Sequence, residues 1–369
     1  MAWRTLPEFV LDENTPQQES YMKQSQIVLG KLLKRAGQSG ALALIALTGV
    51  VRMSTATETT TKFTIFHVAG STMTVVMGST ENGVIVGYYA TKNGAAYRGF
   101  LRATDGTIIT FQVPGSTNSG AAAVNNTGAI AGDYLDGNGV GHGFVRAPDG
   151  TITRFDASKS TGTYVAGIND QGVIAGTYGE SVGPSFGYVR AADGTITKFD
   201  PPGSTYTEVF GINDKGAIAG TYEDSTRIFH GFVRSPDGTI ASFDAPNSSG
   251  ETIGYCINDK GAIVGSYLSG ARTYHAYERA VDGTFAEFDP PGSTASGASS
   301  INNQGAIAGG YVNEFGSNKG FVRATDGTIV TFVPKGSRQM DGAFFSGHGA
   351  IAGSYVDNRE TVLGYVWNM

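Results

Sequence analysis

Short apolar runs alternate with polar turn segments along most of the chain. The unit from Tyr164 to Pro201 holds four such runs, at residues 164–168, 173–178, 186–190 and 195–199. Each run has the length of a β-strand and is rich in Val, Ile, Tyr, Phe and Thr, which favour pleated, half-buried positions. No run is long enough, or spaced at the helical period, to indicate an α-helix. The pattern therefore predicts four β-strands in each unit.

Two kinds of tight turn separate these predicted strands. In the Asn-Asp-x-Gly turns at 169–172, 213–216 and 258–261, the Gly can adopt the left-handed conformation that ends a hairpin turn. The Asn and Asp side chains can accept hydrogen bonds from the turn backbone. The Pro-Asp-Gly segments at 148–150 and 236–238 place Pro at the first central turn position. Each unit is therefore predicted to be a four-stranded antiparallel meander.

An Asp-Gly-Thr tripeptide in the second of these turns shows that the unit repeats. It recurs with spacings of 44 or 45 residues, at Asp105, Asp149, Asp193, Asp237, Asp282 and Asp326. A period of this length with four strands is typical of one β-propeller blade. The second-strand and third-strand motifs each occur seven times, whereas the fourth-strand motif occurs six times and finds its seventh copy at residues 62–66. We therefore predict an all-β fold over residues 57–369, a seven-bladed β-propeller of four-stranded antiparallel blades. The N-terminal strand would close the ring in the last blade.

Composition and charge agree with this architecture and narrow the partners. The chain has 54 Gly, only 16% charged residues and a net charge of −6. Residues 57–369 hold 20 basic and 28 acidic residues, a net charge of −8. An acidic domain without a basic stripe argues against nucleic acid as a partner. The chain has no P-loop, His-Glu-x-x-His or Cys-x-x-Cys motif, so we expect no cofactor and no metal.

Residues 1–56 lie outside the repeat and resemble a leader in their layout. An apolar run of 11 residues, Ala41–Val51, follows Lys31, Lys34 and Arg35, and small residues at 54–56 offer a cleavage site. This order is typical of a secretory signal. It predicts an extracellular or periplasmic protein that contacts a membrane only through an uncleaved leader. The alternative is a short amphipathic helix without a targeting role.

The repeat motifs resemble the HAF-repeat family of bacterial extracellular proteins, which is named for a His-Ala-Phe tripeptide. The matching tripeptides begin at His142, His230 and His275, and the companion Gly-Ile-Asn-Asp-x-Gly motif matches at 167–178 and 211–222. The His is replaced in the other blades, by Arg98, Phe186, Lys319 and Leu363. The resemblance covers all seven units and implies an exported repeat protein. It transfers no catalytic residue.

The loops from second to third strands vary in sequence, and they would share one face of the propeller. Variable loops on a rigid scaffold are where binding sites usually lie. Candidate binding tyrosines end the second strands beside this face, at Tyr134, Tyr178, Tyr222, Tyr267 and Tyr311. Their rings have two interpretations, stacking platforms for sugar rings or packing between blades with the hydroxyl in water.

Charged and imidazole side chains add candidates on the same face. His230 and His275 open third strands, and Arg227 lies in a variable loop. The histidines serve either binding or the repeat structure itself, and their places on different blades disfavour a shared zinc ion. Six arginines end third strands in register, at Arg102, Arg146, Arg190, Arg234, Arg279 and Arg323. We predict that they form an inter-blade ladder of ion pairs with the nearby turn aspartates rather than an anion site.

These observations favour a monomeric, exported, non-catalytic propeller. It would bind a glycan or a cell-envelope or matrix protein through the variable loop face. The alternative is an enzyme, a polysaccharide hydrolase or lyase or a lactonase, with one asymmetric site near the propeller axis. Residues that break the repeat, such as Glu208 and Glu223, are the better catalytic candidates. Their spacing identifies no reaction.

Overall fold

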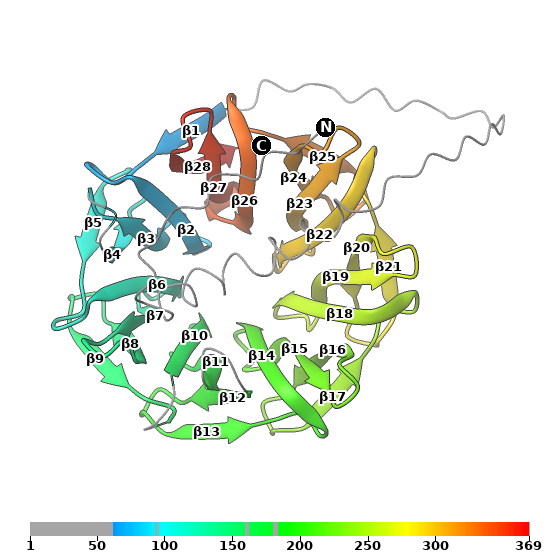
Figure 1. Ribbon diagram of the computed structural model, residues 1–369, viewed down its shortest axis with the longest axis horizontal. Coiled ribbons are helices and arrows are strands. Elements are labelled where there is room, and N and C mark those ends of the chain that lie inside the picture. Colours follow the sequence, from blue (N-terminus) through cyan, green and yellow to red (C-terminus); the bar gives the residue numbers. More distant parts are fainter. Residues whose placement is uncertain (1–61, 93, 95, 159–161, 180–183, 369) are drawn as a thin grey trace. The chain divides into compact units, whose positions relative to one another are not determined.

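The computed structural model describes residues 62–92, 94, 96–158, 162–179 and 184–368, and the predicted leader over residues 1–56 lies outside them. The described residues form 28 β-strands and one short 3-10 helix, η1 (Gly347–Gly349). The strands fall into seven four-stranded blades arranged in a ring (Figure 1). The predicted seven-bladed all-β fold is therefore confirmed.

The strands take four positions in each blade. The innermost strands are β2 (Met73–Ser79), β6 (Asn118–Val124), β10 (Gly162–Ile168), β14 (Ser204–Ile212), β18 (Ser248–Ile257), β22 (Ser293–Ile301) and β26 (Ser337–Phe345). The second strands are β3 (Ile85–Ala90), β7 (Ile130–Leu135), β11 (Ile174–Gly179), β15 (Ile218–Asp224), β19 (Ile263–Ser269), β23 (Ile307–Asn313) and β27 (Ile351–Asp357).

The third strands are β4 (Tyr97–Arg102), β8 (Gly141–Arg146), β12 (Ser185–Arg190), β16 (Phe229–Arg234), β20 (Tyr274–Arg279), β24 (Asn318–Arg323) and β28 (Val362–Asn368). The outermost strands are β5 (Ile108–Phe111), β9 (Ile152–Phe155), β13 (Ile196–Phe199), β17 (Ile240–Phe243), β21 (Phe285–Phe288), β25 (Ile329–Phe332) and β1 (Lys62–Phe66). In the blade counted by β10 to β13, every predicted strand agrees with the observed one to within two residues.

The ring closes by pairing the two ends of the described chain. β1 runs antiparallel to β28, from Lys62 opposite Asn368 to Phe66 opposite Gly364. The first of the 28 strands is thus the outermost strand of the last blade, as the strand count predicts. This pairing covers a sheet edge and ties the first and last blades together.

Every innermost strand carries a register shift that forces glycine onto the second strand. A Cβ added to Gly265 would lie 1.8 Å from the carbonyl oxygen of Ile253, and one added to Gly176 would lie 2.1 Å from that of Tyr164. In six blades a shift begins at the residue after this carbonyl, as between Val165 and Gly167, and in the seventh the carbonyl of Gly342 lies within the shift between Asp341 and Phe344. Only Gly fits beneath such a carbonyl, which explains its return in each second strand.

Neighbouring blades are joined by arginines stacked on phenylalanines. Each third-strand guanidinium lies 4.8–5.3 Å from the ring centroid of a Phe on the outermost strand of the preceding blade, as Arg279 does over Phe243. The predicted ion pairs with turn aspartates are wrong. Among the described residues no such arginine lies in ion-pair distance of one, and each aspartate accepts its own turn backbone N–H instead, as Asp105 does from Thr107. The arginine is therefore a cation–π contact between blades.

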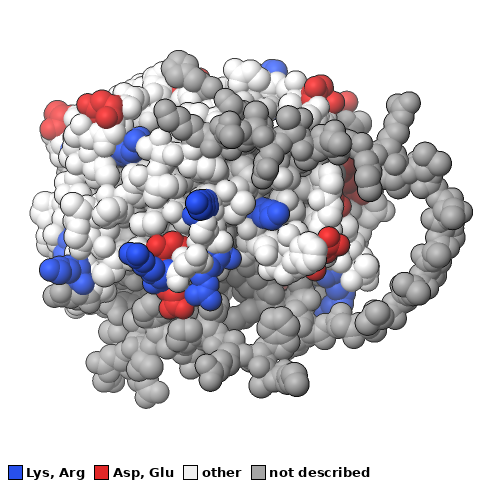
Figure 2. All heavy atoms as spheres, turned by 90° about the horizontal axis from the view of Figure 1, so that it is seen from above, with Lys and Arg blue, Asp and Glu red and all other residues white. Residues whose placement is uncertain are grey.

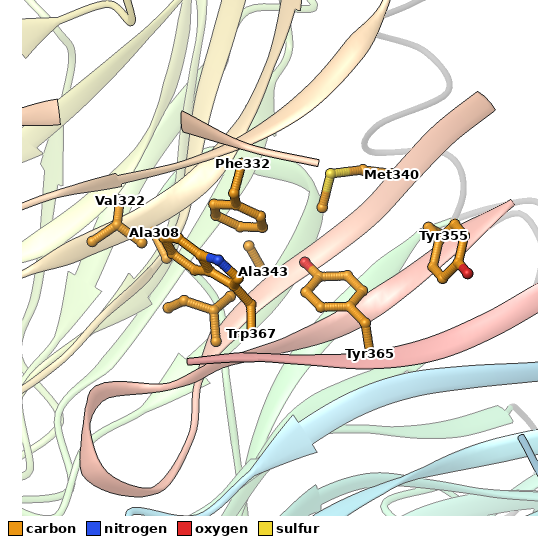
Figure 3. Close-up of a cluster of buried hydrophobic side chains, with 9 residues drawn as sticks. Ala308, Val322, Phe332, Met340, Ala343, Tyr355, Tyr365 and Trp367 are labelled. Carbon is orange, nitrogen blue, oxygen red and sulfur yellow. The ribbon is translucent and has the colours of Figure 1, made fainter. Parts of the chain in front are cut away.

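The seventh blade interface uses tryptophan where the others use arginine. Trp367 occupies the arginine position, since it pairs with Ile351 as Arg190 pairs with Ile174. Its fully buried indole stacks on Phe332, with ring centroids 4.2 Å apart and planes 19° apart. Figure 3 shows this pair beside Tyr365 and Met340 in the cluster where the last two blades meet.

Asparagine side chains join the turns between first and second strands. Asn125, Asn169, Asn213 and Asn258 each donate from Nδ2 to the backbone carbonyl of the equivalent Asn in the next blade, at 2.8–3.2 Å. The same side chains accept N–H groups within their own turns. The predicted turn role of these residues is confirmed and extends across blade boundaries.

The surface is mixed in charge. Figure 2 shows basic and acidic side chains interspersed among uncharged ones on one side of the molecule. Within the described part of the chain, no helix is long and apolar enough to cross a membrane.

Candidate functional site

Five loops between second and third strands share one backbone design. The first residue of each loop has a side chain that accepts hydrogen bonds from backbone N–H groups further along the same loop. Asp224, for example, accepts from the N–H groups of Thr226 and Ile228, two and four residues later, at 2.8 and 2.9 Å. Within the described residues, Ser269 accepts only from the residue four positions later. The members of this group begin at Asp136, Asp224, Ser269, Asn313 and Asp357. Their predicted variability therefore lies in their side chains, while their backbone shape is uniform.

The predicted binding tyrosines are packed into the blades. Tyr134, Tyr222, Tyr267 and Tyr311 are buried, and Tyr178 is half-buried. Three of the rings lie against a third-strand His, with centroids 5.0–5.4 Å apart, and the Tyr178 ring lies against Phe186. Each such ring has one face occupied, which agrees with the packing interpretation of these tyrosines.

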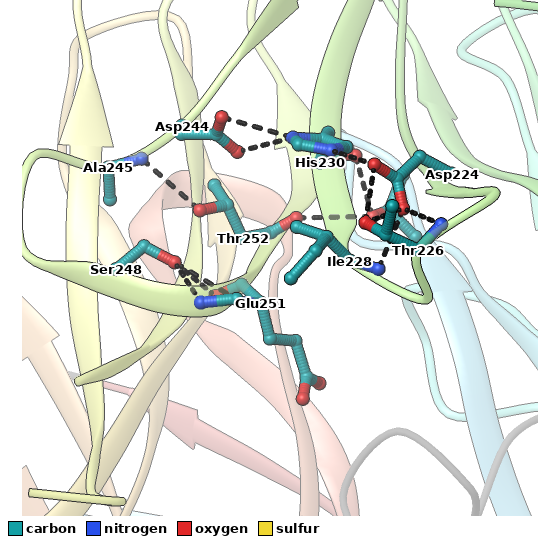
Figure 4. A network of polar contacts seen from close by, with 11 residues as sticks. Asp224, Thr226, Ile228, His230, Asp244, Ala245, Ser248, Glu251 and Thr252 are labelled. Atoms are coloured by element: carbon teal, nitrogen blue, oxygen red, sulfur yellow. Dashed lines mark hydrogen bonds and ion pairs between the residues drawn. The ribbon is translucent and has the colours of Figure 1, made fainter. Parts of the chain in front are cut away.

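The three histidines make the same contact in three blades. Nδ1 lies 2.6–2.9 Å from a carboxylate after the outermost strand, as in the pairs His230–Asp244 and His275–Asp289. His230 Nε2 is also 3.5 Å from Asp224, whereas Ser269 takes the place of that carboxylate near His275. Figure 4 shows His230 held between the two aspartates. No set of three or more metal-ligating side chains gathers anywhere in the described residues.

Arg227 is separate from these histidine contacts. It lies at the exposed end of the loop between β15 and β16, with φ of 68°. Its backbone N–H donates to the backbone carbonyl of Asp224 at 3.1 Å. The structure thus does not bring Arg227, His230, His275 and the tyrosines into one pocket.

A different cluster brings carboxylates and phenol hydroxyls together, at the innermost strands of two adjacent blades. On β14, the Tyr206 hydroxyl donates to Glu208 at 3.2 Å. In the next blade, the Tyr274 hydroxyl of β20 donates to Glu251 of β18 at 2.8 Å. The ring of Tyr255 on β18 packs edge-on against Phe210 of β14, with centroids 5.2 Å apart. We call these five residues, Tyr206, Glu208, Glu251, Tyr255 and Tyr274, the Glu–Tyr cluster.

The Tyr255 hydroxyl is the unusual group in this cluster. It is buried, and neither it nor the buried Ser266 hydroxyl makes a hydrogen bond of normal geometry within the described residues, although the two hydroxyls lie close enough to interact. Burial raises the pKa of Tyr255 well above its ordinary value, the interaction with Ser266 opposes this shift, and the charges of Glu251 and Glu208 add to it. Burial and then Glu208 raise the pKa of Tyr206 in the same way. A buried hydroxyl without a well-formed hydrogen bond costs stability, so Tyr255 is poorly satisfied within this cluster.

Part of this cluster could be found from the sequence. Glu208 breaks the repeat. In the other six innermost strands, the residue at the position of Glu208 is small, apolar or aromatic in five cases and acidic in one, Asp341. Burial raises the pKa of Asp341 to about 6. Sequence reasoning missed Glu251 and Tyr255. Both also depart from the repeat, and this departure could have identified them from the sequence.

Carboxylates and phenols in this arrangement suit polyhydroxylated ligands. A carboxylate oxygen can accept hydrogen bonds from sugar hydroxyls, and aromatic rings offer apolar faces beside them. Two carboxylates in neighbouring blades are also the side chains that glycoside hydrolysis requires.

No family model and no curated protein sequence matches the chain. Solved structures do resemble it. A streptogramin B lyase has a TM-score of 0.56 and 16% identity, covering 84% of this chain and 98% of the lyase chain. The propeller domain of the Trilobed protease from Pyrococcus furiosus has a TM-score of 0.57 and 10% identity, covering 79% and 95%. Puromycin hydrolase has a TM-score of 0.57 and 11% identity, covering 80% of this chain and 53% of its own. These likenesses place the described residues among the β-propellers and show the fold alone.

Proposed function

We propose that the protein is an exported, non-catalytic β-propeller that binds carbohydrate at the Glu–Tyr cluster. The observation that carries this proposal is the buried hydroxyl of Tyr255, which makes no hydrogen bond of normal geometry and lies near the charges of Glu208 and Glu251. A bound sugar hydroxyl would give this group the well-formed hydrogen bond that it lacks. Export rests on the predicted leader and on the resemblance to HAF-repeat proteins.

The cluster replaces the repeated tyrosines as the centre of the proposed site. The second-strand rings are largely buried against His or Phe side chains, so stacking on a sugar would require them to move. A docked envelope or matrix protein remains the other partner class for the loop face. Hydroxyl-accepting carboxylates next to phenols support carbohydrate over a protein surface.

The proposal is tested by binding of the full chain to a panel of neutral and acidic polysaccharides. Tyr255→Phe removes only a hydroxyl that makes no hydrogen bond of normal geometry, so we expect an unchanged fold and binding about two- to tenfold weaker. Glu251→Gln should weaken binding further because it removes a charged acceptor. Tyr311→Phe is the matched control, from the repeated tyrosines, and should bind as the wild type does.

Two results would contradict the proposal. One is a wild-type protein that binds no polysaccharide. The other is a Tyr311→Phe variant that loses binding while Tyr255→Phe retains it, which would return the site to the repeated tyrosines.

A second candidate function is hydrolysis or lysis of a polysaccharide at the same cluster. It is favoured by the two carboxylates, Glu208 and Glu251, each hydrogen-bonded to a phenol. One carboxyl group would act as acid and the other as base or nucleophile. Release of reducing or unsaturated ends by the wild type, abolished in Glu208→Gln with binding retained, would establish this enzyme class. Binding without product release would exclude it for the polysaccharides tested.

A further inference from the structure

Two arginines occupy a backbone conformation that favours glycine. The fourth residue of each shared loop has a positive φ, and in two loops it is Gly139 at 80° and Gly316 at 74°. In the loops between β15 and β16 and between β19 and β20, it is Arg227 at 68° and Arg272 at 61°. A non-glycine residue is strained in this region, and strain of this kind persists where the side chain has a use.

Contacts with neighbouring residues do not explain the two strained arginines. Both arginine side chains are exposed, and among the described residues neither makes an ion pair. The third case differs, because Glu360 at φ 65° lies 3.2 Å from Arg338 and so has a partner within its blade. Asp224, in the same loop as Arg227, already accepts hydrogen bonds from the Ile228 N–H and from the hydroxyl and N–H of Thr226, which lower its pKa to about 2.

The blade that follows the two arginine-bearing blades carries an exposed aromatic ring in its equivalent loop. Phe315, in the loop between β23 and β24, is 81% exposed. Its loop is held by Asn313, whose Oδ1 accepts the N–H groups of Phe315 and Ser317 at 3.1 and 2.8 Å. An apolar ring that is fixed in position and left in water is suited to stack on a sugar ring.

We propose that Arg227, Arg272 and Phe315 form a binding row for an acidic polysaccharide, along the loop face of three consecutive blades. The guanidinium groups would bind carboxylate or sulfate groups of the chain, and the phenyl ring would stack on a sugar. This proposal rests on carbohydrate binding as the function and names its ligand class. The row lies on the blades that carry the Glu–Tyr cluster and on the blade that follows them.

The glycine found in sibling loops provides the test. The full chain and the double variant Arg227→Gly plus Arg272→Gly are titrated with polygalacturonate, dextran sulfate and neutral dextran. We expect affinity for the acidic chain to fall about tenfold in the double variant, since an exposed ion pair contributes about two- to fivefold. Neutral binding should not change. The melting temperature should stay equal or rise by about 1–3 °C, because glycine relieves the strain.

Matched controls separate charge from backbone effects. Glu360→Gly makes the same backbone change but leaves both arginines, so it should bind acidic chains as the wild type does. Phe315→Ala should weaken binding to all sugars without lowering the melting temperature. Comparing the affinity for polygalacturonate with the affinity for dextran sulfate distinguishes a carboxylate ligand from a sulfate ligand.

The outcomes that overturn the row differ from those that overturn the function. If the wild type binds neutral chains and the double variant binds polygalacturonate and dextran sulfate as the wild type does, the row is refuted alone. If the wild type binds single-stranded DNA as tightly as it binds acidic polysaccharide, the sugar assignment of the row is refuted. If it binds no polysaccharide, neutral or acidic, both proposals fail together.

Discussion

Adjacent glycines on β23 provide a sharp test of how the blades are built. A Cβ added to Gly309 would lie 2.1 Å from the carbonyl oxygen of Gly297 and 2.7 Å from the ring of Phe321. A Cβ added to Gly310 would meet nothing closer than the carbonyl oxygen of Lys319, at 3.7 Å. The two residues share a strand but differ completely in the space above them. Gly309→Ala and Gly310→Ala therefore separate steric crowding from the general effect of removing a glycine.

The expected magnitudes differ in sign. Overpacking a well-packed site costs about 1–3 kcal/mol when side chains can adjust, and here the obstacle is a backbone atom that cannot rotate away. We expect Gly309→Ala to lower the free energy of unfolding by about 3 kcal/mol. Gly310→Ala should leave it unchanged or raise it by about 0.5–1 kcal/mol, because glycine in a strand carries an entropic cost.

The assay is thermal unfolding of both variants and the wild type, followed by circular dichroism. For a domain of this length, 3 kcal/mol corresponds to a fall of about 5 °C in melting temperature. A fluorescence-detected denaturant titration gives an independent value. The reasoning is refuted if Gly309→Ala melts within about a degree of the wild type, or if Gly310→Ala is the less stable of the two.

Three further predictions follow from the interfaces and from one buried acid. Trp367→Ala should cost about 3–5 kcal/mol in a denaturant titration, whereas Trp367→Arg, which recreates the contact of the other six interfaces over Phe332, should cost less than half as much. Asn213→Ala should cost about 2–3 kcal/mol, since it removes the donor to Asn258 and leaves turn N–H groups unaccepted. Asp341 has a folded-state pKa raised to about 6. Its penalty therefore develops as pH rises from about 4 to 6, so Asp341→Asn should match the wild type at pH 4 and be more stable at pH 7 by up to about 3 kcal/mol.

The repeat made the fold readable from the sequence. In the unit that spans residues 164–201, the pattern placed each strand within two residues, as β12 (Ser185–Arg190) against the predicted run at 186–190 shows. The missing fourth strand identified the partner of β28 before any coordinates, because a closed ring has no unpaired copy. Strand positions and blade number follow from the local periodicity and from the number of repeats, and both can be read from a single sequence.

Contacts between blades were not readable in the same way. The arginines were expected to join neighbouring blades through ion pairs with turn aspartates, whereas Arg279 joins them by lying over Phe243, a residue of the preceding blade. The hydrogen bond between Tyr274 and Glu251 likewise joins residues 23 positions apart. Side-chain pairing of this kind depends on blade twist and spacing, and residue order alone does not specify it.

Symmetry finally separates structural residues from candidates for binding. Six of the seven blade interfaces share one arginine–phenylalanine contact, so a residue that holds the ring usually recurs, as the arginines, the second-strand glycines and most turn asparagines do. Glu208, Tyr255 and Arg227 depart from the repeat, and one of them holds a buried hydroxyl without a well-formed hydrogen bond while another strains the backbone. Such departures cost stability without serving the ring, which is why we propose a ligand for them. Because they lie on neighbouring blades, the proposal predicts one asymmetric site and a binding stoichiometry of one ligand per chain.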